Sequence, residues 1–189
     1  MLEVLSPGSV GDVKIEHFEI NEHDIRALWD GVLPGKYVRL THFGSVVMSD
    51  TQMEKRTNRE FCVSAHGDVL IGGLGIGMVL LAVQDEDRVR SITVIEKYQD
   101  VIDLVAPQLP LNDKVQIICA DVFDWKPPKG TQYDCVYMDI WDYINKKVYN
   151  EEMKPLKRKW GHYLKPKEDS PKRFNKCWAE WQAKNGRRL

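Results

Sequence analysis

The 189-residue sequence predicts an α/β protein in which helices flank a mostly parallel sheet, preceded by a short N-terminal β region. Two observations lead to this fold class. From residue 68 onward, apolar strand-like runs alternate with helical patterns, and three successive strands end in an acidic residue. Because the carboxyl ends of parallel strands meet at one edge of the sheet, we expect a ligand crevice there.

The first 35 residues are expected to supply the β region and one short helix. Residues 13–20 alternate in the manner of a strand, and Asn21 is suited to cap a helix running to Trp29. Leu33-Pro34-Gly35 has the composition of a turn.

A glycine cluster then separates a strand from a helix. The run Asp68 to Ile71 is apolar after its first residue, Met78 to Val83 has a helical pattern, and Gly72, Gly73, Gly75 and Gly77 lie between them. Glycine permits positive φ and lets a ligand approach the bare backbone, so the turn is typical of a nucleotide-binding site. The next strand, Ser91 to Glu96, ends in a carboxylate about 20 residues later, where ribose hydroxyls would be held.

The alternation of strands and helices continues through two more strands. A helical pattern covers Lys97 to Leu109, a strand covers Lys114 to Cys119, and Ala120-Asp121 follows that strand. The last strand, Tyr133 to Met138, leads into Asp139 and Asp142. We expect Glu96, Asp121, Asp139 and Asp142 to converge, and mutual repulsion to raise at least one pKa into the range of a general base.

The C-terminal segment is basic and rich in aromatic residues. From Lys154 onward there are 12 Lys or Arg against 3 Asp or Glu, whereas the preceding residues carry 15 against 25. We favour two helices over Glu151 to Leu164 and Pro171 to Lys184, with Ser170 as an N-cap and with aromatic faces on the sheet. The alternative is a nucleic-acid surface over residues 154–189, where bases would stack on the rings.

Composition limits where the protein can be located and whether it binds a metal. With 43% hydrophobic residues the chain can bury a core, yet it has no apolar run of about 20 residues and no visible secretory signal. We therefore expect a cytoplasmic, soluble protein that does not enter a membrane. The four cysteines lack Cys-x-x-Cys spacing, so no metal site is expected.

Four segments carry a resemblance to a known family. They are Val69 to Gly77, Ile92 to Glu96, Ala120-Asp121 and Tyr133 to Asp139, and they resemble the Rossmann-like class I S-adenosylmethionine-dependent methyltransferase fold, most of all its spermidine synthase branch. The resemblance covers roughly residues 36–150 and implies a β-hairpin over Tyr37 to Met48, with its turn at His42 to Ser45. We accordingly divide the chain into N-terminal strands and hairpin (1–50), a nucleoside-binding core (51–150) and a basic helical segment (151–189).

The resemblance also implies roles for individual residues. The glycine turn would hold the nucleoside and amino acid moieties, Glu96 the ribose, and Asp121 with Val122 the adenine. Asp139 would act on the attacking amine, and Asp142 would help to hold the substrate. Further pocket walls are expected at Tyr37, Asp50, Trp141 and Tyr143, with Trp141 offering a ring face to a cation.

Departures from the family pattern leave three functional hypotheses. The acid that spermidine synthases carry in the glycine loop is replaced by Leu74 and Ile76, and no glutamine stands near Val47, which argues against aminopropyl transfer. The short basic tail predicts a curtailed sheet.

The first hypothesis is a transferase that uses S-adenosylmethionine or its decarboxylated form on a small nucleophile, with no metal. The second is a nucleic-acid enzyme on the same fold, either a DNA methyltransferase or a lysine-dependent abasic-site lyase. The third is a protein that binds an adenosyl ligand without turnover. A homo-oligomer is compatible with all three.

Overall fold

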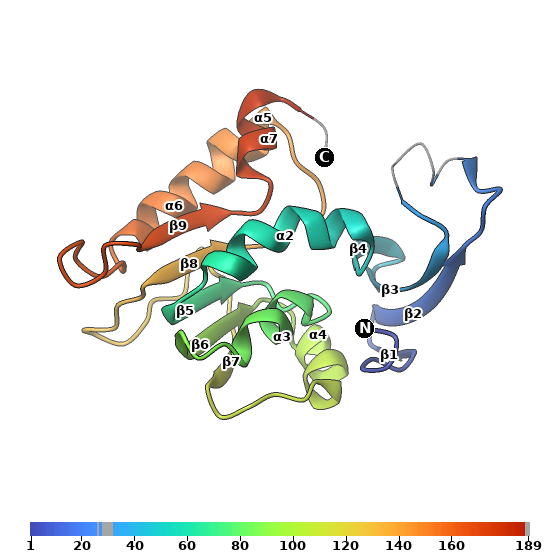
Figure 1. Cartoon of the computed structure of the whole chain (residues 1–189), viewed down its shortest axis with the longest axis horizontal. Helices are drawn as coiled ribbons and strands as arrows, with labels where there is room; N and C mark the ends of the chain where they lie inside the picture. The colour runs from blue at the N-terminus through green and yellow to red at the C-terminus, as the bar shows by residue number, and fades with distance from the viewer. Residues whose placement is uncertain (26, 28–31, 188–189) are drawn as a thin grey trace.

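The computed structural model describes residues 1–25, 27 and 32–187, and it contains two sheets. The antiparallel sheet has the order β1 (Gly8–Val10), β2 (Val13–Ile20), β3 (Gly35–His42) and β4 (Ser45–Ser49). The strand and hairpin predicted in this region are therefore confirmed. Figure 1 shows this sheet at the opposite end of the molecule from the C-terminal helices. The helix predicted over Asn21 to Trp29 lies partly outside the described residues.

The second sheet is parallel and has the strand order β7-β6-β5-β8-β9 among the described residues. Its strands are β5 (Gly67–Gly72), β6 (Val89–Glu96), β7 (Val115–Cys119), β8 (Cys135–Met138) and β9 (Phe174–Cys177). In register, Val69 lies opposite both Ile92 and Cys135. The order places β5 and its glycine turn at the centre, and the predicted α/β class with a curtailed parallel sheet is confirmed.

One face of the parallel sheet is covered by helices α2 (Gln52–Ser64), α3 (Met78–Gln84) and α4 (Gln99–Val105), followed by the 3₁₀ turn η1 (Ala106–Gln108). Side chains alternate across a strand, so Val69 and Ile71 pack on this face while Leu70 packs on the other. The buried face of α2 carries Glu54, Asn58 and Phe61 at helical spacing, so two of its three buried residues are polar.

The opposite face is covered by the C-terminal elements. These are α5 (Lys146–Val148), the π-helix η2 (Tyr149–Met153), α6 (Lys154–Gly161) and α7 (Glu180–Asn185). Trp160 is fully buried here, and its indole N–H donates to the carbonyl of Val122 at 3.2 Å. The C-terminal segment therefore completes the second half of the core.

The helix predicted over Pro171 to Lys184 is wrong. Ser170 caps no helix, and residues Phe174–Cys177 form β9, which pairs with β8 so that Cys135 lies opposite Phe174 and Met138 opposite Cys177. A helix appears only at α7, and the residue that caps its C-terminus is Gly186, with φ of 63°. The four residues of β9 have no strand periodicity of their own. Their conformation follows from pairing with the otherwise open edge of β8, which a helix could not satisfy.

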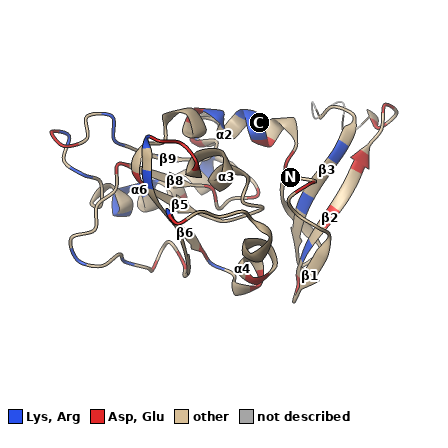
Figure 2. Ribbon diagram, turned by 60° about the horizontal axis from the view of Figure 1, so that its bottom comes forward, with Lys and Arg blue, Asp and Glu red and all other residues tan. Residues whose placement is uncertain are grey.

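Much of the positive charge of the tail is bound by the chain itself. The Lys165 ammonium lies 2.6 Å from Asp68 and 2.7 Å from Asp134, and the Lys159 ammonium donates to three carbonyls between Val122 and Trp125. Figure 2 shows charges of both signs distributed over the molecule, including β2 and β3. These contacts support a C-terminal segment that packs on the sheet, which we call the packed cap. The nucleic-acid surface over residues 154–189 stays a prediction. None of the helices in the described part of the chain is both long and apolar enough to traverse a bilayer.

We expect Trp160→Ala to lower the free energy of unfolding by about 3–5 kcal/mol, because truncating a fully buried ring leaves a cavity. Trp181→Ala is the matched control, since the Trp181 side chain is 65% exposed and should change stability by less than about 0.5 kcal/mol. Urea unfolding followed by circular dichroism measures both. Equal effects of the two substitutions would contradict the packed cap.

Candidate functional site

A cavity of about 330 Å³ lies at the carboxyl ends of β5, β6 and β8 and is closed on one side by β3, β4 and α2. Its volume is at the lower end of the range for small-molecule sites. The four acids that the sequence singles out all lie on its wall. The charged and aromatic groups that line it are Glu54, Glu96, Asp121, Asp139, Asp142, Glu152, His42, Lys97, Tyr98, Phe123, Trp141 and Trp178.

The glycine turn allows two chain segments to meet at the cavity floor. Gly73 has φ of 93°, and a Cβ at this position would overlap the carbonyl oxygen of Asp139. Gly75 has φ of 51°, and a Cβ there would overlap the sulfur of Met48. Both glycines line the cavity, whereas Gly72 is the last residue of β5 and Gly77 packs against Leu109. Two of the four predicted glycines therefore face the cavity, and two support the turn from behind.

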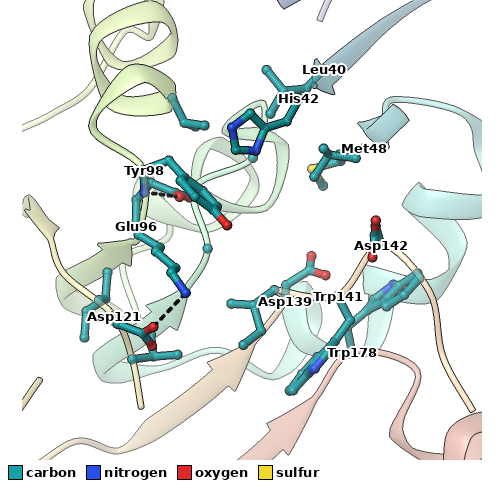
Figure 3. A pocket seen from close by; sticks show the side chains of 18 of the residues that line it. Leu40, His42, Met48, Glu96, Tyr98, Asp121, Asp139, Trp141, Asp142 and Trp178 are labelled. Atoms are coloured by element: carbon teal, nitrogen blue, oxygen red, sulfur yellow. Dashed lines mark hydrogen bonds and ion pairs between the residues drawn. The ribbon is translucent and has the colours of Figure 1, made fainter. Parts of the chain in front are cut away.

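Glu96 is fixed at the edge of the cavity by two backbone amides. One carboxylate oxygen accepts from Leu74 N at 2.8 Å, and the other accepts from Tyr98 N at 2.9 Å. The side chain is 7% exposed, and Figure 3 shows its bond to the backbone of Tyr98. Each carboxylate oxygen has two lone pairs, so both can still accept from a ligand hydroxyl.

Asp121 lines the cavity from the turn after β7 and pairs with the Lys97 ammonium at 2.9 Å (Figure 3). Its other oxygen accepts from Phe123 N at 2.8 Å. Burial alone would raise the pKa of Asp121, but the Phe123 amide and the Lys97 charge outweigh it, so the pKa is lowered. Asp121 is therefore a stable anion, and Val122 beside it supplies an apolar part of the wall.

Asp139 faces the open space of the cavity in Figure 3. Its main chain is held by a bond from Asp139 N to Gly72 O at 2.8 Å, so the end of β5 positions it. Burial, and after it the charge of Glu54, raises the pKa of Asp139 to about 8, while contact with Asn58 lowers it. A raised pKa was predicted from repulsion among the four acids, but the main cause at Asp139 is burial, and the charge that adds to it is that of Glu54, which is not one of the four.

Glu54 is a functional candidate that the sequence reasoning did not identify. It is 8% exposed and lines the cavity from α2. Burial raises its pKa to about 7, against a smaller effect of the Ser49 backbone. The available signal was the spacing of Glu54 and Asn58 in phase with Phe61, which puts two polar side chains on the buried face of a helix.

Two indole rings form the far wall, and each is held through its N–H group. Trp141 donates to Glu152 at 2.8 Å, and Trp178 donates to Thr57 at 3.0 Å. Glu152 lies in the π-helix η2, an element that is frequent at functional sites. Asp142 lines the same end, and Figure 3 places it near Trp141. Rings beside carboxylates favour a cationic group.

Three residues expected as pocket walls lie elsewhere. Tyr37 is buried and its hydroxyl donates to Leu33 O at 2.7 Å. Asp50 accepts from Val38 N at 2.7 Å and pairs with the N-terminal ammonium at 3.3 Å. Tyr143 is 60% exposed. The Tyr37 hydroxyl also bonds to Gln52 of α2. Asp50 instead joins β3 to the N-terminus of the chain, and neither side chain lines the cavity.

Among the described residues, no group of three or more His, Cys, Asp or Glu has the geometry of a metal site.

Comparisons with known proteins identify the fold. No protein-family model matches the sequence, and no curated protein matches it significantly. A crystal structure of spermidine synthase from Thermotoga maritima aligns with 86% of this chain at 18% identity and a TM-score of 0.50. A spermidine synthase structure in complex with the transition-state analogue AdoDATO aligns over the same share at 18% identity and 0.51. This chain covers 53% of each of those chains, about half their length.

A smaller likeness is to the N-methyltransferase NodS from Bradyrhizobium japonicum WM9 in complex with S-adenosyl-L-homocysteine. The two chains are 13% identical, the alignment covers 60% of this chain and 57% of that chain, and the TM-score is 0.47. At such identities the likeness shows the fold alone. The chain has the class I S-adenosylmethionine-dependent methyltransferase fold and resembles the spermidine synthase branch.

We expect the stability of the protein to depend on pH through Glu54 and Asp139. Their pKa values are raised in the folded state, so their stabilising contribution is complete below about pH 4 and is lost as the pH rises through 7 to 8. Between pH 5 and 9 the wild type should therefore lose stability relative to the double variant Glu54→Gln, Asp139→Asn. The relative loss should exceed about 1.4 kcal/mol, the equivalent of one pKa unit.

Urea unfolding at fixed ionic strength measures this difference, and its value at pH 5 serves as the internal reference. Parallel curves for the two proteins from pH 5 to 9 would show that both carboxyls titrate normally.

Proposed function

We propose that this protein is a transferase that binds S-adenosylmethionine or its decarboxylated form and moves an alkyl group from the sulfonium to a small nucleophile. The observation that carries the proposal is the cavity at the glycine turn, whose wall holds six carboxylates and, among the described residues, only Lys97 and His42 as basic groups. Lys97 is already paired with Asp121. A sulfonium ligand is a cation, so the charge of the cavity suits it.

The nucleoside would lie between the glycine turn and the end of β6. Gly73 and Gly75 leave room for close approach, and the Glu96 carboxylate is held at the edge where ribose hydroxyls would arrive. Asp121 and Val122 then provide an acceptor and an apolar surface for the base. One of the spermidine synthase structures that this chain resembles contains the transition-state analogue AdoDATO, a ligand of this adenosyl class.

Transfer requires a nucleophile aligned with the activated carbon and a group that takes its proton. Asp139 lies on the cavity floor beside Gly73, and its pKa of about 8 suits a base near neutral pH. The sulfonium is already a good leaving group, so positioning and charge contribute most of the rate. Asp142 and the Trp141 ring would hold the cationic part of the acceptor.

The side chains of the glycine loop indicate which alkyl group would be transferred. Leu74 and Ile76 are buried, at 5% and 0% exposure, and Gly75 meets the sulfur of Met48. The loop therefore offers no carboxylate to the amine of an aminopropyl chain, which favours S-adenosylmethionine over its decarboxylated form.

Calorimetric titrations with S-adenosylmethionine, decarboxylated S-adenosylmethionine and S-adenosylhomocysteine test the proposal. We expect micromolar binding of at least one of them. Absence of binding for all three in the folded protein would refute the proposed function. A duplex DNA oligomer, titrated in the same buffer, tests the nucleic-acid alternative.

Glu96→Ala should weaken adenosyl binding by about 1.5–3 kcal/mol, the scale of a hydrogen bond to a charged group. Because Glu96 also anchors Leu74 N, the thermal midpoint of the variant has to be measured beside its affinity. Glu16→Ala is the control, since Glu16 lies on β2 and pairs with Arg39 away from the cavity. Unchanged affinity in a folded Glu96→Ala protein would remove the ribose assignment.

Asp139→Asn should lower turnover by about 10²-fold or more, because general-base catalysis typically contributes 10² to 10⁴. The affinity for S-adenosylhomocysteine should stay nearly the same, because the amide keeps the shape of the carboxyl. Steady-state kinetics and calorimetry on the same preparation separate these effects. An equal loss of binding and turnover would make Asp139 a ligand contact instead.

A further inference from the structure

The outer side of the C-terminal helices carries cations that the protein itself does not neutralise. The inner side of α5, η2 and α6 is buried in the core through Val148, Met153 and Leu156. On the outer side, a set of exposed Lys and Arg side chains forms no ion pair within the described part of the chain. They are Lys146, Lys154, Arg158, Lys184 and Arg187.

The acids of the same helices are already engaged. The Glu151 carboxylate lies 3.9 Å from the Lys147 ammonium, and the Glu180 carboxylate accepts from Lys157 at 2.7 Å. Glu152 is turned inward and lines the cavity. These carboxylates therefore leave the outer side with an excess of positive charge, which favours a polyanionic partner.

The helices that carry the unpaired cations lie together. Lys157 of α6 reaches Glu180 in the first turn of α7. At the other end of α7, a Cβ on Gly186 would lie 3.0 Å from Cε of Lys146 in α5. Figure 1 shows α5 and α7 side by side near the C-terminus. The cations of the three helices therefore belong to one region of the surface.

Trp181 projects from the same region. Its side chain is 65% exposed, and it lies three residues before Lys184, so both occupy one side of α7. A single exposed ring is common on proteins. A ring among unpaired cations, however, is the combination that binds a phosphate chain and stacks on one of its bases. We call Trp181 and the five unpaired cations the basic surface.

We propose that the basic surface binds single-stranded nucleic acid, with phosphates at the cations and a base stacked on Trp181. The chemistry that it recognises is a phosphodiester chain with unpaired bases, whether DNA or RNA. A duplex suits it less, because the bases of a duplex are already stacked on one another. The surface would bind its ligand whether or not the cavity catalyses transfer.

The basic surface adjoins the cavity but differs from it in charge. Asp142 and Glu152 line the cavity, and α5 begins at Lys146, shortly after Asp142 in the chain. The carboxylates of the cavity would repel phosphates, so the cavity itself is unsuited to hold the strand. A strand on the basic surface would instead pass the end of the cavity that Trp141 and Asp142 form.

Fluorescence anisotropy with labelled oligo(dT) and oligo(U), each of about 20 nucleotides, tests the proposal on the ligand-free protein. Both should bind, and affinity should fall as salt rises. Contact with three to five phosphates gives a slope of log K against log[salt] of about −2 to −3.5. Absence of binding to both oligomers at about 50 mM salt, or an affinity that salt does not change, would overturn the proposal.

Charge reversal locates the site. Lys184→Glu combined with Arg187→Glu should weaken oligo(dT) binding about 10-fold or more and make the salt slope shallower. Lys14→Glu combined with Lys36→Glu is the matched control, because both lysines are exposed on the antiparallel sheet at the other end of the molecule. It changes the net charge equally and should leave the affinity within about 2-fold of the wild type. Equal losses in the two double variants would show a response to net charge alone and would overturn the proposed surface.

Substitution of Trp181 separates base stacking from phosphate binding. Trp181→Ala should weaken oligo(dT) binding by about 5- to 100-fold, whereas Trp181→Phe should retain most of the affinity. Inorganic polyphosphate, which has no bases, should bind the wild type and Trp181→Ala equally. Thermal midpoints from circular dichroism show that the variants are folded. If Trp181→Ala leaves the oligo(dT) affinity unchanged, or weakens polyphosphate binding as much, Trp181 does not stack on a base and the proposal fails.

Two other polyanions complete the test. A DNA duplex of about 20 base pairs and vesicles that contain phosphatidylserine should both bind more weakly than oligo(dT) at the same salt concentration. Tighter binding of either one would assign the surface to a duplex or a membrane and would overturn the proposal. A protein that binds S-adenosylhomocysteine but neither oligomer keeps the proposed transferase function and loses this surface, and the opposite result does the reverse.

Discussion

The site depends on the close approach of the glycine turn to the chain that follows β8. Gly73 stands where any side chain would overlap the carbonyl oxygen of Asp139, and Asp139 N donates to Gly72 O at 2.8 Å. These two constraints join the ends of adjacent parallel strands. They place the Asp139 carboxyl, the bare backbone of the turn and the Glu96 carboxylate around one small volume. A larger residue at Gly73 would separate them.

Charge in the cavity follows from how each acid is held. Asp121 is stabilised as an anion by Lys97 and a backbone amide, and Glu96 accepts two backbone bonds. Glu54 and Asp139 have few such partners, and burial raises their pKa values to about 7 and about 8. The same cavity thus contains fixed anions for a cationic ligand and carboxyls that can exchange protons near neutral pH.

Much of the fold was predictable, since β5 to β8 are apolar runs separated by turn residues and helical spacings. The four acids after these strands were predictable for the same reason, because parallel strands present their carboxyl ends at one edge. β9 was not predictable, since Phe174–Cys177 becomes a strand through its pairing with β8. Glu54 was missed because a polar residue on a helix is usually solvated, and only packing shows that it faces a cavity. Tyr37 and Asp50 were misplaced because the Tyr37 hydroxyl bonds to Gln52 of α2 and Asp50 pairs with the N-terminal ammonium.

A crystal structure with bound S-adenosylhomocysteine tests the central claim most directly. We expect the ribose hydroxyls within hydrogen-bonding distance of the Glu96 carboxylate, the nucleoside against Gly73 and Gly75, and the sulfur facing Asp139. A ligand bound elsewhere on the molecule, or an empty cavity in crystals grown at a saturating concentration of the ligand, would contradict it.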